Sequence, residues 1–401
     1  MTTYHLDSAL SDDMKQVRDT VHRFAVEVMR PAAAELDRMS DASDVVAPDS
    51  VLWKVMDRYK ELGIGDPSKY DPDLSPAERA LLHAVVLEEL SWGDVGLAIS
   101  VGLCDTIAPW ALGFGRQEAY EYFSKREDIG CLALTEPDHG SDHVGFTEPI
   151  FSDPAVRPSC RARREGNEYV INGQKAAWVS NGTIATAAAL FCTMEDSKDG
   201  LKGGAAFLVP LELPGVSRGK PLDKIGQRSL NQGEIFFSDV RVPEAFMLIE
   251  GPDAYGMVWE MVLKQANSAM GQQFVGVARA ALDHAVAYAK ERVQGGVPII
   301  QHQGVKARLF RMFSKVEAAR ALARRVAVEA AVADIPFQHA AASKIVCTQT
   351  AYEVAHDAVQ IFGGNGLARE YPVEKLFRDA RASLIEDGEN DFLGLMAASR
   401  L

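Results

Sequence analysis

A dense group of carboxylates lies close to the C-terminus of this chain of 401 residues. Glu386, Asp387, Glu389 and Asp391 fall within six residues, interrupted by a single glycine at Gly388. Carboxylates this close raise one another's pKa, so the arrangement is unfavourable unless water solvates the charges or the protein uses them. An acidic tail of this kind usually forms a solvated helix cap. The alternative is that one carboxylate turns inward at the glycine and acts as a general base.

The residues before this acidic segment resemble the C-terminal signature of the acyl-CoA dehydrogenase family. The matching segments are Gln360–Gly366, Glu370–Lys375 and Arg378-Asp379-Ala380. In that family the residue before a glycine, in a segment reading roughly Tyr-Glu-Gly-Thr, removes the α-proton of the substrate. The resemblance assigns this role to Asp387, which is one methylene shorter than the usual glutamate. Ala266 occupies the alternative base position of some relatives and carries no carboxylate, which leaves Asp387 with little competition.

Length and composition indicate a globular protein of two or three domains, since 47% of the residues are apolar. The net charge of −14 disfavours nucleic acid and anionic membrane surfaces as partners. No apolar run approaches the roughly 20 residues of a membrane span, and residues 1–7 lack the features of a secretion signal. Five scattered cysteines without a CxxC spacing predict neither a disulfide framework nor a zinc site, and they favour a reducing, cytoplasmic location.

The hydrophobic pattern is helical at both ends of the chain. Ser11-Asp12-Asp13 is expected to cap a helix that continues to Pro31. Further helical periodicity covers Val51–Leu62, Pro76–Leu90, an apolar interior stretch at 95–111, a stripe from Val305 to Val326, and residues 340–362.

Short β-like runs begin near Ile129, and Asn172-Gly173 is expected to form a hairpin turn between two of them. We therefore expect an α+β fold: an N-terminal helical domain (1–127), a middle β-barrel or sandwich domain (128–245) and a C-terminal four-helix bundle (246–401). This is the order of domains in the family that the chain resembles.

Two segments of the expected β domain offer what a flavin ring needs, namely an aromatic wall with hydroxyl and backbone donors. Leu132–Asp142 runs from a strand into a polar turn, and Trp178–Gly182 ends another strand. His139 and His143 do not share a helix face in that turn, and no third ligand follows at a fixed spacing, so a metal site is not predicted.

The resemblance implies that these segments contact FAD. It places Leu134 and Thr135 against the pyrimidine side of the ring, Trp178 beside the ring, and the Ser180 hydroxyl near N5. Ser141 matches a residue that contacts both the pyrophosphate side of the cofactor and the CoA arm of the substrate.

A second set of matches concerns the FAD of a neighbouring subunit. Arg292 matches an arginine that pairs with the pyrophosphate, a charge-assisted contact. Gln360, Gly363 and Gly364 match contacts to the adenosine half. Because both segments contact the FAD of a neighbouring subunit in the family, they imply a homotetramer built as a dimer of dimers. Gly295 stands where the family has a phenylalanine, which removes one wall of the adenosine site.

Other departures affect charge near the cofactor and the substrate. Glu389 and Asp391 stand where the family commonly has uncharged residues near FAD, so their carboxylates would repel phosphate unless they point away. Lys264 and Asn267 replace an aspartate and an arginine that help to bind CoA and the catalytic loop. A carrier-protein thioester or an unusual acyl group therefore becomes more plausible as a substrate.

The resemblance implies α-proton abstraction from an acyl thioester and transfer of the β-hydrogen as hydride to flavin N5, with an electron-transfer flavoprotein as the electron acceptor. The shorter reach of Asp387 favours a bulky, cyclic or branched acyl chain. Asp105, a lone acid in an apolar run, is the candidate second acid for a 1,4-dehydrogenation of a cyclic enoyl-CoA. Two further alternatives are a flavin monooxygenase or oxidase of the same fold and a non-catalytic helical binding protein.

Overall fold

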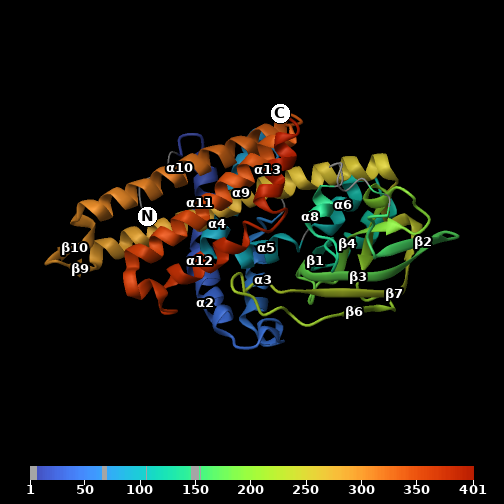
Figure 1. The fold of residues 1–401 in the computed structure, drawn as a ribbon, viewed down its shortest axis with the longest axis horizontal. Coiled ribbons are helices and arrows are strands. Elements are labelled where there is room, and N and C mark those ends of the chain that lie inside the picture. The colour runs from blue at the N-terminus through green and yellow to red at the C-terminus, as the bar shows by residue number, and fades with distance from the viewer. Residues whose placement is uncertain (1–6, 66–69, 105, 146–152, 154) are drawn as a thin grey trace.

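Helices occupy both ends of the chain and a sheet occupies the middle in the computed structural model (Figure 1). The structure describes residues 7–65, 70–104, 106–145, 153 and 155–401. The N-terminal elements are α1 Asp12–Phe24, η1 Ala25–Met29, α2 Arg30–Arg38, η2 Ala42–Val46, α3 Val51–Leu62, α4 Pro76–Gly93, α5 Val95–Gly102, α6 Ile107–Gly113 and α7 Gln117–Phe123.

Local capping explains where several of these helices begin. The Ser11 side chain accepts a hydrogen bond from the backbone N–H of Met14, which confirms the predicted start of α1. The predicted end of this helix at Pro31 was wrong. The chain keeps helical backbone angles through the π-helical η1 into α2, and Pro31, which has no N–H to donate, follows directly after this π-helical turn.

The middle of the chain forms one sheet with the strand order β6-β7-β3-β2-β4-β5-β8, and β1 pairs with β4 in parallel. Every residue of β4 and β5 is buried, as expected for strands that are covered on both faces. The elements are β1 Gly130–Ala133, α8 Ser141–Val144, β2 Arg161–Glu165, β3 Glu168–Ser180, β4 Ala187–Met194, η5 Gly200–Lys202, β5 Gly204–Pro210, β6 Val216–Arg218, β7 Gln232–Pro243, η6 Glu244–Phe246 and β8 Met247–Glu250.

The hairpin turn predicted at Asn172-Gly173 was also wrong. Both residues lie inside β3, where the register with β7 shifts between Ile171 and Gly173. Gly173 has φ 136°, and a Cβ there would lie 2.5 Å from the Cα of Cys160. The glycine therefore allows a β-bulge and a close approach between backbones, which leave the same sequence signal as a turn.

The C-terminal part is a helical bundle around α9, a helix of 40 residues that begins beside the sheet and ends at a small hairpin (Figure 1). Its elements are α9 Pro252–Glu291, β9 Val293–Gln294, β10 Val297–Pro298, η7 Ile299–Gln301, α10 Gln303–Val332, α11 Phe337–Phe362, η8 Gly363–Leu367, α12 Pro372–Ala382 and α13 Asn390–Ala398.

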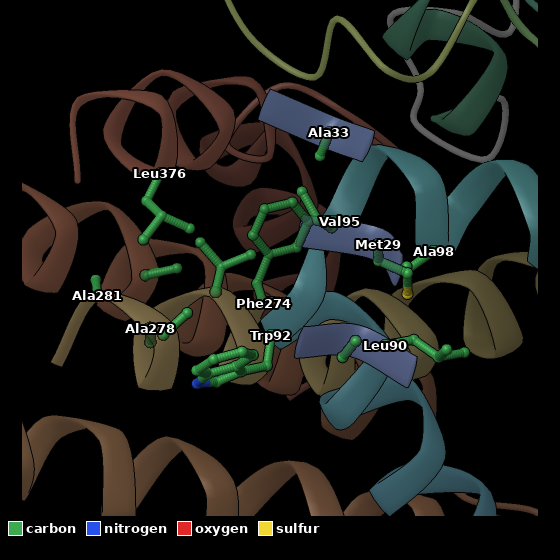
Figure 2. Close-up of a cluster of buried hydrophobic side chains, with 14 of the residues drawn as sticks. Met29, Ala33, Leu90, Trp92, Val95, Ala98, Phe274, Ala278, Ala281 and Leu376 are labelled. Carbon is green, nitrogen blue, oxygen red and sulfur yellow. The ribbon is translucent and has the colours of Figure 1, made fainter. Parts of the chain in front are cut away.

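Helix α9 contributes to both large hydrophobic cores. Near its middle, Phe274 is fully buried in the core that joins the N-terminal helices to the bundle, close to Trp92 and Leu376 (Figure 2). Near its start, Trp259 packs against Phe191 of β4, with ring centroids 5.2 Å apart. Burial of each large side chain contributes about 1.5–3 kcal/mol, so α9 couples the sheet to the bundle.

Within the described residues, no single helix is long and apolar enough to cross a membrane. Helices α5 and α6 reach the length and apolar content of a membrane span only when taken together, and they are bent by 52° relative to each other. Most of α5 is buried inside the protein.

The bulge at Gly173 gives a test of this packing. We expect Gly173→Ala to destabilise the protein by about 2–5 kcal/mol, because the new methyl group meets the Cys160 backbone and a positive φ is unfavourable for alanine. The matched control is Gly304→Ala in α10, where the new Cβ meets no atom within 4 Å. Urea unfolding should show a neutral or slightly stabilising effect for the control. Equal stability of the two variants would contradict the bulge.

Candidate active site

The acidic segment forms a tight turn between α12 and α13. Asp387 has φ 51° and Gly388 has φ 96°, and the backbone N–H of Asn390 donates to the Leu384 carbonyl across the turn at 3.0 Å. Positive φ is uncommon for a residue other than glycine. Such conformations cost about 1–3 kcal/mol and persist where the surrounding structure holds them, often at functional sites. Asp387 is therefore kept in an unusual conformation.

A buried lysine of α11 holds this turn. Lys344 is 0% exposed, and its ammonium donates to the Gly388 carbonyl and to Asn390 Oδ1, each at 2.7 Å. Burial lowers the pKa of Lys344 to about 8, against the effect of the nearby carboxylates, Asp387 foremost. From α9, Asn267 Nδ2 donates to the Asp387 carbonyl at 3.4 Å. Two helices, α9 and α11, thus fix the backbone around one aspartate.

The environment of Asp387 suits a general base. Loss of hydration raises the pKa of its carboxyl group, and the Lys344 ammonium opposes part of that rise. The residue is exposed in the single chain. A carboxylate that faces an open space lined by protein has both properties. Water can touch its surface, and the surrounding protein still removes much of the hydration that would stabilise its charge. A carboxylate with a raised pKa holds an abstracted proton more firmly than a free one.

The other carboxylates of the segment have separate environments. Glu389 is the N-cap of α13, and its side chain accepts from the Phe392 N–H at 2.9 Å. Glu386 accepts from Gln227 Nε2 at 2.8 Å. Asp391 is exposed in the first turn of α13. The helix-cap interpretation therefore fits Glu389 but does not describe Asp387.

On the sheet, a buried ion pair fixes the first of the predicted flavin segments. Lys175 of β3 and Glu136 are both 0% exposed, and their charged groups lie 2.7 Å apart. Lys175 also donates to the Leu134 carbonyl at 2.8 Å, and the next N–H along β3, that of Ala176, donates to the Thr135 carbonyl at 2.8 Å. Leu134 and Thr135 are therefore attached to the strand that carries Trp178.

The second flavin segment lies at the end of β3. Trp178 is 59% exposed, which is unusual for such a large aromatic side chain. The Ser180 hydroxyl accepts from Gln232 Nε2 at 3.2 Å, as does the Trp178 carbonyl. An uncovered indole beside half-buried hydroxyl groups fits a flat ring with a polar edge. These residues would hold the ring system of FAD.

The loop between β6 and β7 connects this strand end to the acidic turn and reaches from the sheet towards α12 (Figure 1). Gln232 Oε1 accepts from Lys224 Nζ at 2.7 Å at the sheet end of the loop. Further along, the Gln227 N–H donates to Asp379 Oδ1 of α12 at 2.5 Å, and the Gln227 side chain donates to Glu386. We call residues 224–232 the connecting loop.

Four predicted cofactor residues lie elsewhere. Arg292 ends α9 and precedes the hairpin β9-β10, whose turn contains Gly295 and Gly296 at positive φ. Gln360 lies in the last turn of α11, Gly363 and Gly364 begin η8 directly after it, and all four residues are exposed. Forty residues of α9 span roughly 60 Å. The hairpin β9-β10, which follows Arg292, lies at the opposite end of the molecule from the sheet (Figure 1).

The remaining predicted residues lie at separate places in the structure. Ser141 begins the short helix α8, and Asp105 lies outside the described residues. Asn267 contacts the Asp387 carbonyl as described above, and its Oδ1 is buried without a hydrogen-bond partner. Lys264 instead pairs with Asp334 at 2.7 Å. It lines a groove of about 1240 Å³ between α4, α9 and α10, whose lining does not include Asp387.

The two histidines of the polar turn differ in their contacts: His139 pairs with Asp142, whereas His143 Nε2 is buried without a hydrogen-bond partner. His139 Nδ1 donates to Asp142 at 2.5 Å, and burial lowers the pKa of His143 to about 3. The described residues contain no group of three or more side chains with the arrangement of a metal site. All five cysteines are buried and free.

A carboxylate with a raised pKa and an exposed indole beside hydroxyl groups are together what a flavin-dependent dehydrogenase needs. Sequence profiles of the acyl-CoA dehydrogenase N-terminal, middle and C-terminal domains match residues 11–125, 131–240 and 258–401. The mitochondrial short-chain specific acyl-CoA dehydrogenase of rat (Rattus norvegicus) is 31% identical over 407 residues, which cover 100% of this chain and 92% of the rat protein.

Two further comparisons agree. The mitochondrial 2-methylacyl-CoA dehydrogenase of potato (Solanum tuberosum) is 30% identical over 398 residues, covering 98% of this chain and 91% of the potato protein. The solved structure of butyryl-CoA dehydrogenase from Megasphaera elsdenii has a TM-score of 0.84 at 28% identity, covering 98% of each chain. The chain belongs to the acyl-CoA dehydrogenase family. It is an FAD-dependent oxidoreductase that dehydrogenates the CH–CH bond of acyl-CoA.

Replacement of the buried lysine tests the environment of the base. Lys344→Met removes both hydrogen bonds to the turn and the charge that lowers the pKa of Asp387. We expect the acid limb of substrate-dependent flavin reduction to move to higher pH, and the maximal rate to fall on the order of 100-fold through misplacement of the base. Lys54→Met, on the exposed face of α3, is the control. An unchanged limb in a folded Lys344→Met variant would contradict this role.

The ion pair beneath the flavin segments gives a separate test. Lys175→Met leaves the Glu136 charge buried without its partner, at a cost of about 3–5 kcal/mol. The double variant Lys175→Met/Glu136→Gln removes both charges and should recover most of this loss. Chemical unfolding measures the stability, and flavin absorbance measures the FAD content. If the double variant is less stable than the single one, the pair does not act as described.

Proposed function

We propose that this enzyme desaturates a short, branched or cyclic acyl-CoA and that Asp387 is its catalytic base. The observation that carries the proposal is the Asp387 carboxyl group itself, which has a raised pKa in a turn fixed by Lys344 and Asn267. An acyl thioester α-proton is far too weakly acidic for a solvated aspartate to remove, so the base must be partly dehydrated and held in place.

Asp387 acts twice in this mechanism. Its carboxylate removes the α-proton and holds it. Its backbone N–H donates to the thioester oxygen, so that the enolate charge forms beside a fixed donor. Bound FAD supplies the two-electron acceptor that takes the β-hydrogen as hydride. Trp178 and Ser180 orient that cofactor, and the product is a 2,3-unsaturated thioester.

The proposed acyl group rests on the relatives and on the base. The similar proteins from rat, potato and Megasphaera elsdenii are named for short-chain, 2-methylacyl and butyryl substrates. Asp387 reaches less far than glutamate by one C–C bond, about 1.5 Å. We therefore propose that the acyl chain is branched or cyclic, so that its α-carbon lies closer to the turn than that of a straight chain. Asn267, uncharged where the resemblance to the family implies an arginine, contacts the turn itself through the Asp387 carbonyl.

The partners follow from the family. An electron-transfer flavoprotein is the proposed acceptor of electrons from the reduced enzyme. The proposed assembly is a homotetramer in which Arg292, Gln360, Gly363 and Gly364 contact FAD bound by a neighbouring subunit. Their exposure in the single chain and the distance of Arg292 from the sheet support a contact across an interface. The proposed location is the cytoplasm.

Replacement of the base tests the function directly. We expect Asp387→Asn to keep bound FAD and to lose about 100- to 10,000-fold in the rate of anaerobic flavin bleaching by acyl-CoA, as is typical when a general base is removed. Asp387→Glu, which restores the longer side chain, is the matched variant and should retain measurable turnover with a changed preference among straight, branched and cyclic acyl groups.

The substrate panel also distinguishes a dehydrogenase from a flavin monooxygenase or oxidase of the same fold. Bleaching of the wild-type enzyme by dithionite but by no acyl-CoA would contradict a dehydrogenase of these substrates. Full activity of Asp387→Asn would remove Asp387 from its role as the base.

A further inference from the structure

Gln232 ends the connecting loop and begins β7, directly opposite Ser180, the last residue of β3. Its side chain is only 6% exposed, so both ends of its amide need partners inside the protein. A lysine lies at one end of the amide, and the end of β3 lies at the other. The function proposed above gives Ser180 a role beside the flavin but gives none to Gln232.

The neighbours of this amide fix which end carries the oxygen. Lys224 Nζ lies 2.7 Å from one end, and an ammonium group can only donate, so this end is Oε1. The Trp178 carbonyl lies 3.2 Å from the other end and can only accept, so that end is Nε2. Two independent contacts therefore require the same orientation of the amide.

Lys224 is itself held in place as a donor. Its ammonium also donates to the Leu230 carbonyl at 2.8 Å, within the same loop. Burial lowers the pKa of Lys224 to about 8, and the carboxylates of Glu386 and Asp379 oppose that shift. At pH 7 the side chain is therefore mostly protonated, and it keeps the amide oxygen on its own side.

The amide nitrogen also meets the Ser180 hydroxyl. Gln232 Nε2 lies 3.2 Å from Ser180 Oγ, and because this nitrogen can only donate, Oγ must accept. A hydroxyl has one hydrogen and two lone pairs, so its hydrogen points away from the amide. Among the described residues, none accepts a hydrogen bond from this hydroxyl. The half-buried Ser180 therefore has a hydrogen to donate beside the exposed indole of Trp178.

We propose that Gln232 is a positioning residue for hydride transfer, because its oriented amide leaves the Ser180 hydroxyl able only to donate, towards N5 of the flavin. The inference rests on the proposed place of Ser180 beside the ring. A donor to N5 withdraws electron density from the atom that accepts the hydride, which favours the transfer. A freely rotating hydroxyl would donate to N5 only part of the time.

The experiment compares Gln232→Leu, Ser180→Ala and the double variant with the wild-type holoenzyme at pH 7. Anaerobic single-turnover flavin reduction is measured with the acyl-CoA of the panel above that bleaches the wild type fastest. Each single variant should reduce the flavin about 3- to 10-fold more slowly, the usual effect of one lost hydrogen bond, with the affinity for acyl-CoA unchanged. The double variant should be no slower than Ser180→Ala, because Gln232 acts through the same hydroxyl.

Resonance Raman spectra of the oxidised flavin test the contact without turnover. The bands that involve N5 should shift in Ser180→Ala, and they should shift in the same direction in Gln232→Leu. Lys224→Met should give a smaller shift, because the Trp178 carbonyl still holds the amide nitrogen. Lys220→Met removes the same charge from an exposed side chain nearby and is the control, which should leave the bands unchanged.

The outcomes separate this inference from the proposed function. Losses that add up in the double variant would show that Gln232 does not act through Ser180, whatever the activity of Asp387→Asn. If no acyl-CoA bleaches the wild type, the proposed desaturation is rejected, and the Raman comparison still decides the inference. Gln232→Met replaces Gln232→Leu if the latter does not fold. If neither folds, unchanged N5 bands in Ser180→Ala overturn the inference, and shifted bands support it.

Discussion

The structure depends on keeping apart four like charges that the sequence places within six residues. Each carboxylate has a different partner: the helix N-terminus for Glu389, an amide for Glu386, a buried lysine near Asp387, and water for Asp391. Opposite or neutral partners reduce the repulsion without moving the backbone. Because these partners come from α11, α13 and the connecting loop, the turn can form only when the bundle and the sheet are packed together.

A second constraint acts on the sheet side. The pair of Lys175 and Glu136 is fully buried, and such pairs are tolerated only with good geometry and further hydrogen bonds. Glu136 accepts the N–H groups of Ser159 and Cys160, while Lys175 reaches the Leu134 carbonyl. The bulge at Gly173 lies just before Lys175 on the same strand. The predicted flavin segments are thus supported by a rigid, satisfied polar core, as a preorganised cofactor site requires.

Local signals in the sequence predicted local structure well. Ser11 and Pro76 mark helix starts that the structure contains. The prediction of a hairpin turn at Asn172-Gly173 was wrong because a β-bulge and a turn both need a flexible backbone. Lys344 was missed because one lysine among alanines and valines has no sequence signature when its partner Gly388 lies 44 residues away. The sequence shows Glu386 as one of a group of acids, but it does not predict the contact with Gln227. Only tertiary packing brings these two residues together.

The length of α9 separates Arg292 from the sheet of its own chain. One end of this helix lies beside the sheet that carries Trp178 and Ser180, and the other end carries Arg292, roughly 60 Å away. If Arg292 pairs with the FAD pyrophosphate, as the resemblance to the family implies, the FAD it contacts cannot be the one whose ring lies against its own sheet. A complete cofactor site then requires a second copy of the chain, so FAD binding and assembly would stabilise each other by mass action. The exposed indole of Trp178 and the exposed guanidinium of Arg292 are, on this argument, two halves of one site that a single chain separates.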